Sequence, residues 1–189
     1  MGVLVRTARG LLVPVAMLSV LAGLAGCAAS RTAVPASLPE RDLKKLILAD
    51  QQYSLQTVPP AASAQRAASF RIAAEGQRAL KEGRVDEAED RLERALSLDA
   101  RNPFCYLYLA EIRFRAGDPE QALVLLDQSE MHFDGHPYWL SEVYTKRGIC
   151  LEKLRSPEDA RRSYRKALEY NPWNETPKKR LERRESSRG

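Results

Sequence analysis

The sequence is poor in the residue types that most often carry chemistry. Its 189 residues include two histidines and three cysteines. It contains no glycine-rich phosphate-binding loop, no Gly-x-Ser-x-Gly motif and no His-Glu-x-x-His motif, the sequence signatures of several common catalytic sites. We therefore expect that the protein is not an enzyme and that it binds no cofactor.

The two histidines, His132 and His136, are separated by Phe-Asp-Gly. Gly135 disfavours the helix that would bring both rings to one metal ion, and no cysteine or glutamate-rich helix is near them in the sequence. A metal site is conceivable here, but a solvated loop is the interpretation that we prefer.

The apolar run near the N-terminus, from Leu11 to Ala25, is short for a transmembrane helix and contains Pro14. It follows Arg6 and Arg9, with no acidic residue nearby. A basic stretch followed by an apolar run of this length is typical of a secretory signal peptide. We therefore expect residues 1–26 to be a signal peptide.

The run ends in Leu-Ala-Gly-Cys at residues 24–27, which resembles a bacterial lipobox. The resemblance implies cleavage before Cys27 and acylation of that cysteine, for example with palmitate, so that the chain is anchored in a membrane. Because Ala28 and not aspartate follows, we expect the periplasmic face of the outer membrane. The alternative is an ordinary signal peptide with a coincidental cysteine.

The composition changes along the segment after Cys27. Residues 27–39 are rich in Ala, Ser, Thr and Pro and are expected to form a flexible tether. Residues 40–62 contain a possible helix followed by a proline-rich linker. The apolar residues of that helix are Leu43, Leu46, Ile47 and Tyr53. Loss of Arg6 and Arg9 with the signal peptide lowers the formal charge from +5 to +3, which says little about partners.

A turn phrase returns three times in the second half of the chain. It reads Gly-Arg-Val-Asp-Glu-Ala at 83–88, Gly-Asp-Pro-Glu-Gln-Ala at 117–122 and Arg-Ser-Pro-Glu-Asp-Ala at 155–160. The final alanines are 34 and then 38 residues apart, a period that indicates a repeat architecture.

Small or apolar residues flank each phrase at helical spacing, twelve residues before its alanine and four and seven after it. They are Gly76, Leu92 and Ala95, then Ala110, Leu126 and Ser129, then Gly148, Tyr164 and Ala167. These spacings place side chains on one helical face. Each unit is therefore a helix-turn-helix that must stack on its neighbours to bury that face, which predicts an all-α solenoid.

This pattern resembles the tetratricopeptide repeat (TPR) family over about residues 69–172. The residues that carry the resemblance are Gly76, Gly83, Ala88, Ala95 and Leu96; Tyr106, Leu109, Ala110, Gly117, Asp118 and Ala122; and Tyr144, Gly148, Ala160, Tyr164, Ala167, Leu168 and Pro172. Four residues depart from the family pattern. Ser129 replaces a small apolar residue, Arg155 replaces the turn glycine, and Glu75 and Arg147 stand where leucine is preferred.

The resemblance implies about three repeats, at about 69–102, 103–136 and 141–174, within an array that spans 63–172. Residues 131–137 add four residues between the second and third copies. A basic capping helix and tail are expected over 173–189, because a repeat array needs a solvated end.

Cys105 and Cys150 would meet an oxidising compartment if the chain is exported. In the repeat frame they lie on neighbouring first helices with an offset of seven residues, about 10 Å along the helix axis. A disulfide requires a Cα separation of roughly 4.4–6.8 Å. We therefore expect two buried thiols, with a disulfide bridge as the alternative.

TPR arrays resemble one another in holding a protein or peptide ligand on the inner face of their first helices. Carried onto this chain, the implied groove consists of Phe70, Gln77, Leu80, Lys81, Phe104, Leu107, Glu111, Phe114, Arg115, Thr145, Ile149, Glu152 and Lys153. Its apolar strip would accept an extended or helical segment. Alternatively, the strip packs against the chain's own residues 40–56, whose leucines have few other places to be buried.

The third repeat and the tail are rich in basic residues. They are Arg147, Lys153, Arg155, Arg161, Arg162, Arg165, Lys166, Lys178, Lys179, Arg180, Arg183 and Arg184. Acidic residues are interleaved with them, so we favour a salt-bridged, solvated face over contact with anionic lipid or cell-wall polymer. Nucleic acid is not an expected partner, because the segment lacks interleaved aromatic residues.

Together these patterns predict a lipid-anchored TPR adaptor that binds a partner protein or peptide in the cell envelope. The layout resembles envelope TPR lipoproteins such as type IV pilus pilotins, so the expected setting is assembly of an outer-membrane, pilus or secretion machine. The alternatives are an adaptor for cell-wall enzymes, or a structural envelope protein whose basic C-terminal surface contacts polymer or lipid. The sequence does not indicate the oligomeric state.

Overall fold

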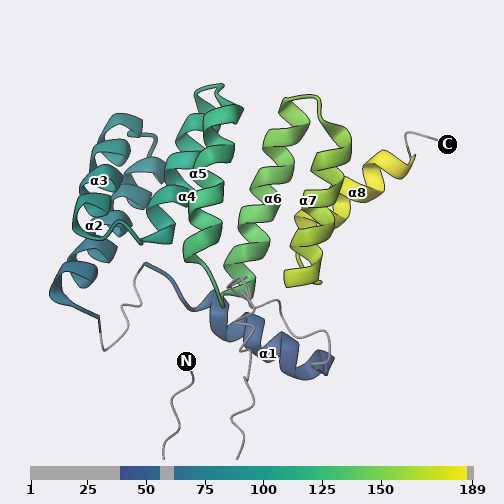
Figure 1. Ribbon diagram of the computed structural model, residues 1–189, viewed down its shortest axis with the longest axis horizontal. Coiled ribbons are helices and arrows are strands. Elements are labelled where there is room, and N and C mark those ends of the chain that lie inside the picture. Colours follow the sequence, from purple (N-terminus) through teal and green to yellow (C-terminus); the bar gives the residue numbers. More distant parts are fainter. Residues whose placement is uncertain (1–38, 56–61, 187–189) are drawn as a thin grey trace, which may run out of the picture. The chain divides into compact units, whose positions relative to one another are not determined.

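The chain folds into helices over the residues that the structure, a computed structural model, describes: 39–55 and 62–186. Eight helices lie in this part of the chain, without strands (Figure 1). They are α1 (Glu40–Gln51), α2 (Ala64–Lys81), α3 (Val85–Leu98), α4 (Pro103–Arg115), α5 (Pro119–His132), α6 (Pro137–Lys153), α7 (Pro157–Tyr170) and α8 (Glu175–Ser186). The predicted all-α solenoid is confirmed. The predicted signal peptide, Cys27 and tether lie outside the described residues.

Helices α2 to α7 form three antiparallel pairs, α2 with α3, α4 with α5 and α6 with α7, and α8 packs against α7 and α6. Within the described ranges, no helix has both the length and the apolar character needed to cross a bilayer.

The three turn phrases adopt one backbone geometry. Gly83 and Gly117 have φ of 80° and 88°, in the left-handed region. Arg155 takes the same place in the third turn with φ of 57°, a conformation that glycine adopts more readily than arginine. The amides of these residues donate to Leu80, Phe114 and Glu152 at 3.1–3.2 Å. The turn therefore survives the loss of its glycine in the third repeat.

Small residues bring the paired helices together, as the spacing predicts. Ala88, Ala122 and Ala160 are fully buried. A Cβ atom on Gly76 would lie 3.0 Å from Leu92 Cγ, and one on Gly148 would lie 2.6 Å from Tyr164 Cδ1. Glycine at these two positions thus allows a bulky side chain of the second helix to pack against the backbone of the first.

Buried asparagines close the first and third repeats. Asn102 Nδ2 donates to Ser69 Oγ at 3.0 Å, and Asn174 Nδ2 donates to Ser141 Oγ at 3.0 Å. Each asparagine also accepts a hydrogen bond from the backbone at the start of the next helix, at 3.2 Å. Each closure therefore satisfies buried polar groups and begins the following helix.

The second repeat closes differently. Pro103 and His136 stand where the other repeats have serine and asparagine, and Ser129 Oγ donates to the carbonyl oxygen of Pro103 at 3.1 Å. The serine that departs from the family pattern thus supplies the hydroxyl that Pro103 lacks. His136 is consequently free to contact a different part of the chain.

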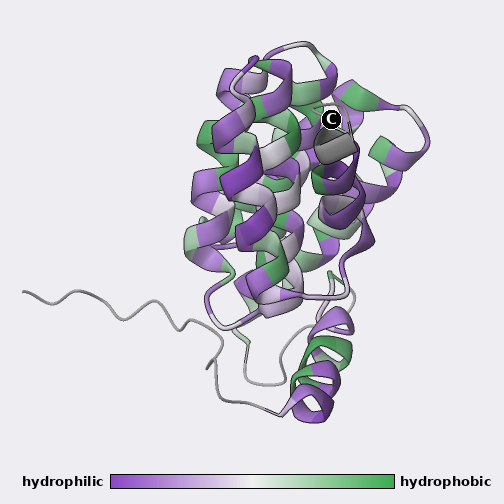
Figure 2. Cartoon of the chain, turned by 90° about the vertical axis from the view of Figure 1, so that its right-hand side faces the viewer, coloured by the Kyte–Doolittle hydropathy of each residue, from purple (hydrophilic) through white to green (hydrophobic). Residues whose placement is uncertain are grey.

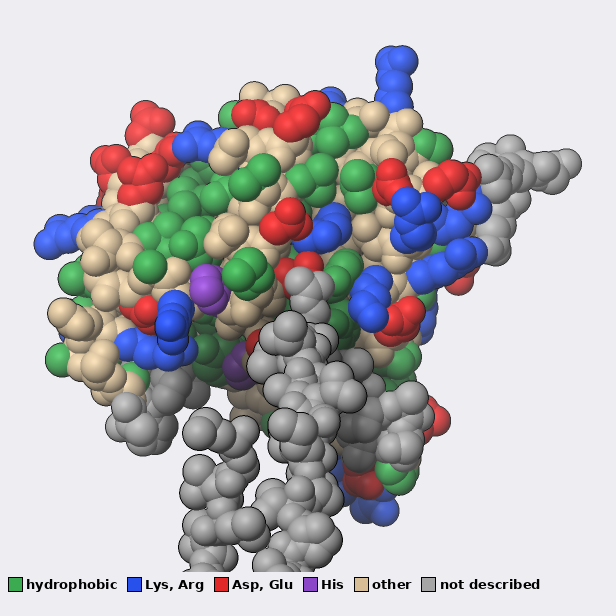
Figure 3. All heavy atoms as spheres, viewed as in Figure 1, with side chains coloured by type: hydrophobic (Ala, Val, Ile, Leu, Met, Phe, Trp, Pro, Cys, Tyr) green, Lys and Arg blue, Asp and Glu red, His purple; other side chains and the backbone are tan. Residues whose placement is uncertain are grey.

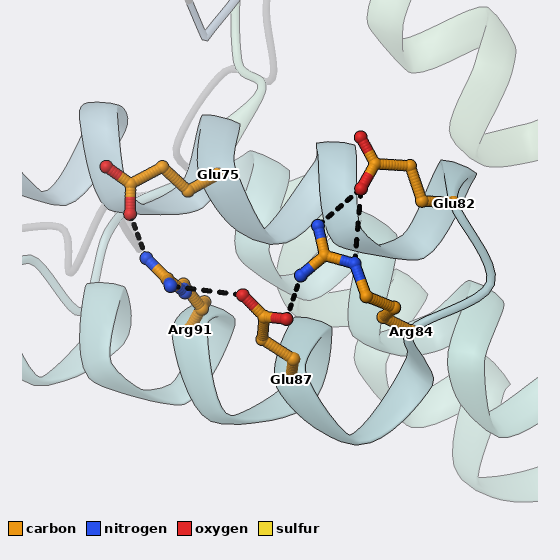
Figure 4. A network of polar contacts seen from close by, with 5 residues as sticks. All are labelled: Glu75, Glu82, Arg84, Glu87 and Arg91. Atoms are coloured by element: carbon orange, nitrogen blue, oxygen red, sulfur yellow. Dashed lines mark hydrogen bonds and ion pairs between the residues drawn. The ribbon is translucent and has the colours of Figure 1, made fainter.

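The two charged departures from leucine form ion pairs between helices. Glu75 of α2 pairs with Arg91 of α3, which also contacts Glu87 (Figure 4). Arg147 of α6 pairs with Asp127 and Glu130 of α5. These positions are partly exposed, so a charged pair replaces a leucine without burying an uncompensated charge.

Candidate ligand-binding groove

The first helices of the repeats, α2, α4 and α6, are joined by polar pairs at one register. Gln77 Nε2 of α2 donates to the hydroxyl of Tyr108 on α4. At the equivalent positions of the next two repeats, Lys146 Nζ of α6 lies 3.1 Å from Glu111 Oε2 of α4. These pairs mark the middle of the predicted groove and divide it into two halves.

An apolar cleft of about 230 Å³ opens in one half, between α4 and α6. Its lining residues are Ala110, Glu111, Phe114, Arg115, Leu126, Lys146, Ile149 and Cys150. Nine of the thirteen predicted groove residues lie on these two helices, and four of the nine line the cleft: Glu111, Phe114, Arg115 and Ile149. Phe114 and Ile149 are only partly buried, so a ligand can reach both.

Glu111 organises the charges at the mouth of this cleft. Its two carboxylate oxygens contact Arg115 and Lys146, one each. Burial by itself would raise the pKa of Glu111, but Lys146 and Arg115 together hold that pKa below its ordinary value. Two cations share one carboxylate, which leaves the mouth of the cleft with an excess of positive charge.

Three cations occupy one repeat position near the ends of the first helices: Lys81, Arg115 and Lys153. All three residues are exposed. Neither lysine forms an ion pair with any residue in the described part of the chain. Their place in the last turn of each helix is favourable for cations because of the helix dipole.

The other half of the predicted groove is filled by the chain itself. Residues Glu40–Leu55, here called the N-terminal strap, run past the starts of the first helices. The ring of Tyr53 lies 6.3 Å from that of Phe70 and 5.6 Å from that of Phe104, and Leu55 joins the same core. Phe70 and Phe104 are fully buried, so their assignment to an open groove was wrong, and the alternative of internal packing applies to them.

Other predicted groove residues also face inward. Leu80 and Leu107 are buried in the core. Thr145 is buried and donates to the carbonyl oxygen of Ser141 at 2.7 Å. Glu152 pairs with Arg180 of α8 at 2.6 Å. The prediction treated these four as surface, but Leu80 and Leu107 belong to the core, Thr145 also contacts Asn174, and Glu152 is paired with α8. Partner contact by the exposed members of the set stays a prediction.

The prediction of a solvated histidine loop was wrong. His132 ends α5 and stacks on Tyr106, whereas His136 precedes α6 and stacks on Tyr53, with ring centroids 4.0 Å apart. Nδ1 of His136 lies 2.6 Å from Oδ1 of Asp50, whose Oδ2 accepts from the backbone amide of Tyr138 at 2.7 Å. In the described ranges, no group of three or more His, Cys, Asp or Glu residues could hold a metal ion.

Sequence reasoning missed Asp50, Leu55 and His136 as residues that shape the groove. A signal for one of them was present, because His136 stands where the repeat period places Asn102 and Asn174. Tyr53 was recognised as part of an apolar stripe but not as the ring that fills the groove.

Cys105 and Cys150 are as predicted, free and buried, in place of a bridge. Burial raises the pKa of the Cys150 thiol to about 11 and raises that of Cys105 still further. Both thiols are thus protonated at neutral pH, including Cys150 at the base of the cleft.

Positive charges in the third repeat and α8 are largely compensated. Arg161, Arg162 and Lys166 pair with acidic residues three positions away on α7, and Lys178 does so on α8. Figure 3 shows red and blue side chains interleaved toward the end of the array where Figure 1 places α7 and α8. This arrangement agrees with the salt-bridged face that the sequence favours.

Comparisons with known proteins match this geometry. A family model described as a tetratricopeptide repeat matches residues 79–141, and a second one matches residues 141–172. A search of curated protein sequences gave no match.

Several solved structures are similar in fold. The first TPR domain of Spaghetti (RPAP3) is 22% identical, with a TM-score of 0.57, and the match covers 68% of this chain and 98% of that one. The TPR domain of Arabidopsis OM64 is 22% identical, with a TM-score of 0.57 and coverage of 64% and 96%. The N-terminal domain of stress-induced protein-1 from C. elegans is 17% identical, with a TM-score of 0.56 and coverage of 64% and 98%. Residues 79–172 of this chain are therefore tetratricopeptide repeats, and they form a TPR solenoid.

Proposed function

We propose that the protein is a lipid-anchored adaptor that holds a segment of a partner protein in the cell envelope. The observation that carries this proposal is the cleft between α4 and α6, where Phe114 and Ile149 remain accessible. An apolar cleft flanked by cations suits an apolar anchor side chain with polar residues on either side. The pairing of Glu111 with two cations keeps the mouth of the cleft in one shape before a ligand arrives.

The similar structures support binding of a peptide by this fold. The first TPR domain of Spaghetti (RPAP3) was solved with an HSP90 peptide, SRMEEVD. We transfer from it the kind of ligand, a short peptide segment, and not its sequence, because the identity is only 22%.

The N-terminal sequence supports the anchor. Leu-Ala-Gly-Cys at residues 24–27 and the preceding apolar run suit lipidation at Cys27, and Ala28 suits delivery to the outer membrane. In that setting the adaptor would serve assembly of an outer-membrane, pilus or secretion machine, or would gather cell-wall enzymes. The alternative of a basic surface that binds polymer or lipid is weakened by the ion pairs on α7 and α8.

Affinity capture from detergent-solubilised membranes tests the adaptor. The double variant Phe114→Ala/Ile149→Ala should lose a specific partner that the wild type retains, because truncation of a buried anchor costs about 2 kcal/mol or more, roughly 30-fold in affinity. Val124→Ala is the matched control, since Val124 is an exposed apolar residue that does not line the cleft. Equal capture by all three proteins would contradict the proposal.

The anchor is tested separately by Cys27→Ala. The wild type should incorporate labelled palmitate and sediment with membranes, whereas the variant should do neither. A variant that remains in the membrane fraction would contradict lipid anchoring. Retention on cell-wall polymer that the cleft variants leave unchanged would support the structural alternative.

A further inference from the structure

The second repeat lacks the asparagine–serine hydrogen bond of the other two repeats and contacts the N-terminal strap instead. Its sister repeats place Asn102 and Asn174 on a buried serine, whereas His136 at the same repeat position turns to Asp50 instead. The four extra residues between the second and third repeats follow His136 in this frame, and two of them, Tyr138 and Trp139, contact the strap. The insertion and the exchanged residue therefore build one feature, a site for the strap.

The strap contacts this site through a carboxylate and, three residues later, a tyrosine. Both carboxylate oxygens of Asp50 are bound, one by His136 and one by the amide of Tyr138, and its side chain is 4% exposed. Tyr53 stacks on His136 with an interplanar angle of 9°, and its carbonyl oxygen accepts from Trp139 Nε1 at 2.6 Å. The carboxylate of Asp50, the ring of Tyr53 and the carbonyl oxygen of Tyr53 therefore each contact a specific group of the array, beyond a fit of shape alone.

Below Tyr53 lies a cluster of rings contributed by four different helices or their ends. Phe104 is at its centre, with ring centroids 5.9 Å from Phe70, 5.0 Å from Phe133 and 4.9 Å from Trp139. All three contacts are edge-to-face, the arrangement that aromatic pairs prefer. The array thus provides the receiving surface, and the strap adds the covering ring.

Most residues of α1 are exposed. Only Ile47 and Asp50 of α1 are buried, whereas Leu46 and Leu48 are 40% and 52% exposed. Figure 2 shows hydrophobic and hydrophilic residues side by side along α1. Elements with few buried contacts open at a lower free energy than the core. The buried contacts that would have to be broken include those of Ile47, Asp50 and Leu55, together with the ring contacts of Tyr53.

We propose that this site recognises a segment presenting a carboxylate and, three residues later, a tyrosine, and that Asp50–Leu55 is its exchangeable internal occupant. A partner segment with the same chemistry displaces the strap and takes its place in the half of the groove that the strap now fills. The proposal does not depend on the α4–α6 cleft, and its test does not use the partner sought there.

The test uses the full chain with the strap contacts removed, Asp50→Ala/Tyr53→Ala, and a fluorescent synthetic peptide of residues 40–55. The peptide should bind this variant at least tenfold more tightly than the wild type, because in the wild type a tethered copy competes at high effective concentration. Adding His136→Ala to the variant should weaken binding at least tenfold. A peptide carrying the same two alanines should not bind.

Circular dichroism first checks that the variant is folded. If the peptide then binds the variant no more tightly than the wild type, does not bind it, or binds without saturation, the proposal is overturned. Hydrogen exchange on the wild type covers the case of a variant that does not fold. The Tyr138 amide, which donates to Asp50, should exchange faster than the amides in the middle of α4. Exchange of both at the rate of global unfolding would make the strap an inseparable part of the core. A wild-type dimer formed by strap exchange, seen by light scattering, would assign the site to a second copy and overturn the separate partner.

Discussion

Asp50 Oδ1 lies 2.6 Å from His136 Nδ1, and this contact joins residues 86 positions apart in the sequence. It attaches the N-terminal strap to the junction between the second and third repeats. The inner face of the array is thereby divided into a half that the chain covers and a half that stays open. A ligand-binding surface inferred from repeat positions alone therefore includes residues such as Phe70 and Phe104 that are buried in the folded chain.

Gly148→Ala should be strongly destabilising, whereas Gly76→Ala should be mild. A Cβ on Gly148 would lie 2.6 and 2.7 Å from ring atoms of the buried Tyr164, which has no room to move. We expect a loss of about 2–3 kcal/mol in the free energy of unfolding, as for overpacked cores. At Gly76 the nearest atom is Leu92 Cγ at 3.0 Å, and the gain in helix propensity of about 1 kcal/mol offsets most of the strain. Urea unfolding measures both, and equal losses would contradict the packing described.

Arg155→Gly should stabilise the protein by about 0.5–1 kcal/mol. Arg155 has φ of 57°, and the left-handed region costs a non-glycine residue roughly 1–2 kcal/mol. Glycine removes this strain, but its larger loss of conformational entropy on folding offsets part of the gain. Gly117→Arg is the matched reverse change and should be destabilising. A loss of stability in Arg155→Gly would show that the arginine makes a contact that outweighs its backbone strain.

Glu111→Gln and Glu142→Gln should shift stability in opposite directions at pH 7. The folded-state pKa of Glu111 is lowered, so its charge contributes stability above its ordinary pKa that is lost as pH falls through the lowered value. Burial raises the pKa of Glu142, more than Lys146 and Asn174 lower it, so ionisation of Glu142 costs stability as pH rises above its ordinary pKa. We expect a loss of about 1 kcal/mol in the first variant and a smaller gain in the second.

Thermal unfolding of both glutamine variants and the wild type from pH 3 to pH 8 checks these signs. The gain in Glu142→Gln should vanish below about pH 4, where both folded and unfolded wild type carry a protonated carboxyl. Shifts of the same sign in the two variants at pH 7 would contradict the assigned environments.

The thiols of Cys105 and Cys150 should be alkylated slowly in the folded protein. With a pKa of about 11 for Cys150, its thiolate fraction at pH 8 is roughly a hundredfold below that of an unperturbed cysteine of pKa about 9. Iodoacetamide labelling of Cys27→Ala should thus be at least that much slower in buffer than in urea. In urea without reductant, the Cys27→Ala variant should show two free thiols in a thiol titration. A titration that finds no free thiol would indicate a disulfide between Cys105 and Cys150.

Much of the fold follows from local spacing. The helix pairs were predicted correctly from the positions of Ala88, Ala122 and Ala160. Each of these alanines contacts residues of its own repeat, and the sequence separations between the contacting residues recur in every repeat. The departures at Glu75, Ser129 and Arg147 could be recognised as departures, but not explained. Their partners Arg91, Pro103 and Glu130 are identified only by the packing of one helix on another.

The candidate groove was predicted less well, for a related reason. Phe104 and Phe114 are both apolar residues on the same helix, and the sequence offers no way to rank their exposure. Phe104 is buried because Tyr53 and Trp139, from distant segments, cover its ring. Phe114 instead lines an open cleft, which no segment from residues 39–55 or 62–186 fills.

The sequence by itself determined the repeat unit, its period and the helix faces within it, because those depend on interactions between residues a few turns apart. The tertiary structure decided which half of the inner face is open, because that depends on where the strap lies. The strap is held by a few long-range contacts, Asp50 with His136 and Tyr53 with Trp139 above all. Such contacts have no periodic signature, since each occurs once and joins segments that the repeat pattern treats as unrelated.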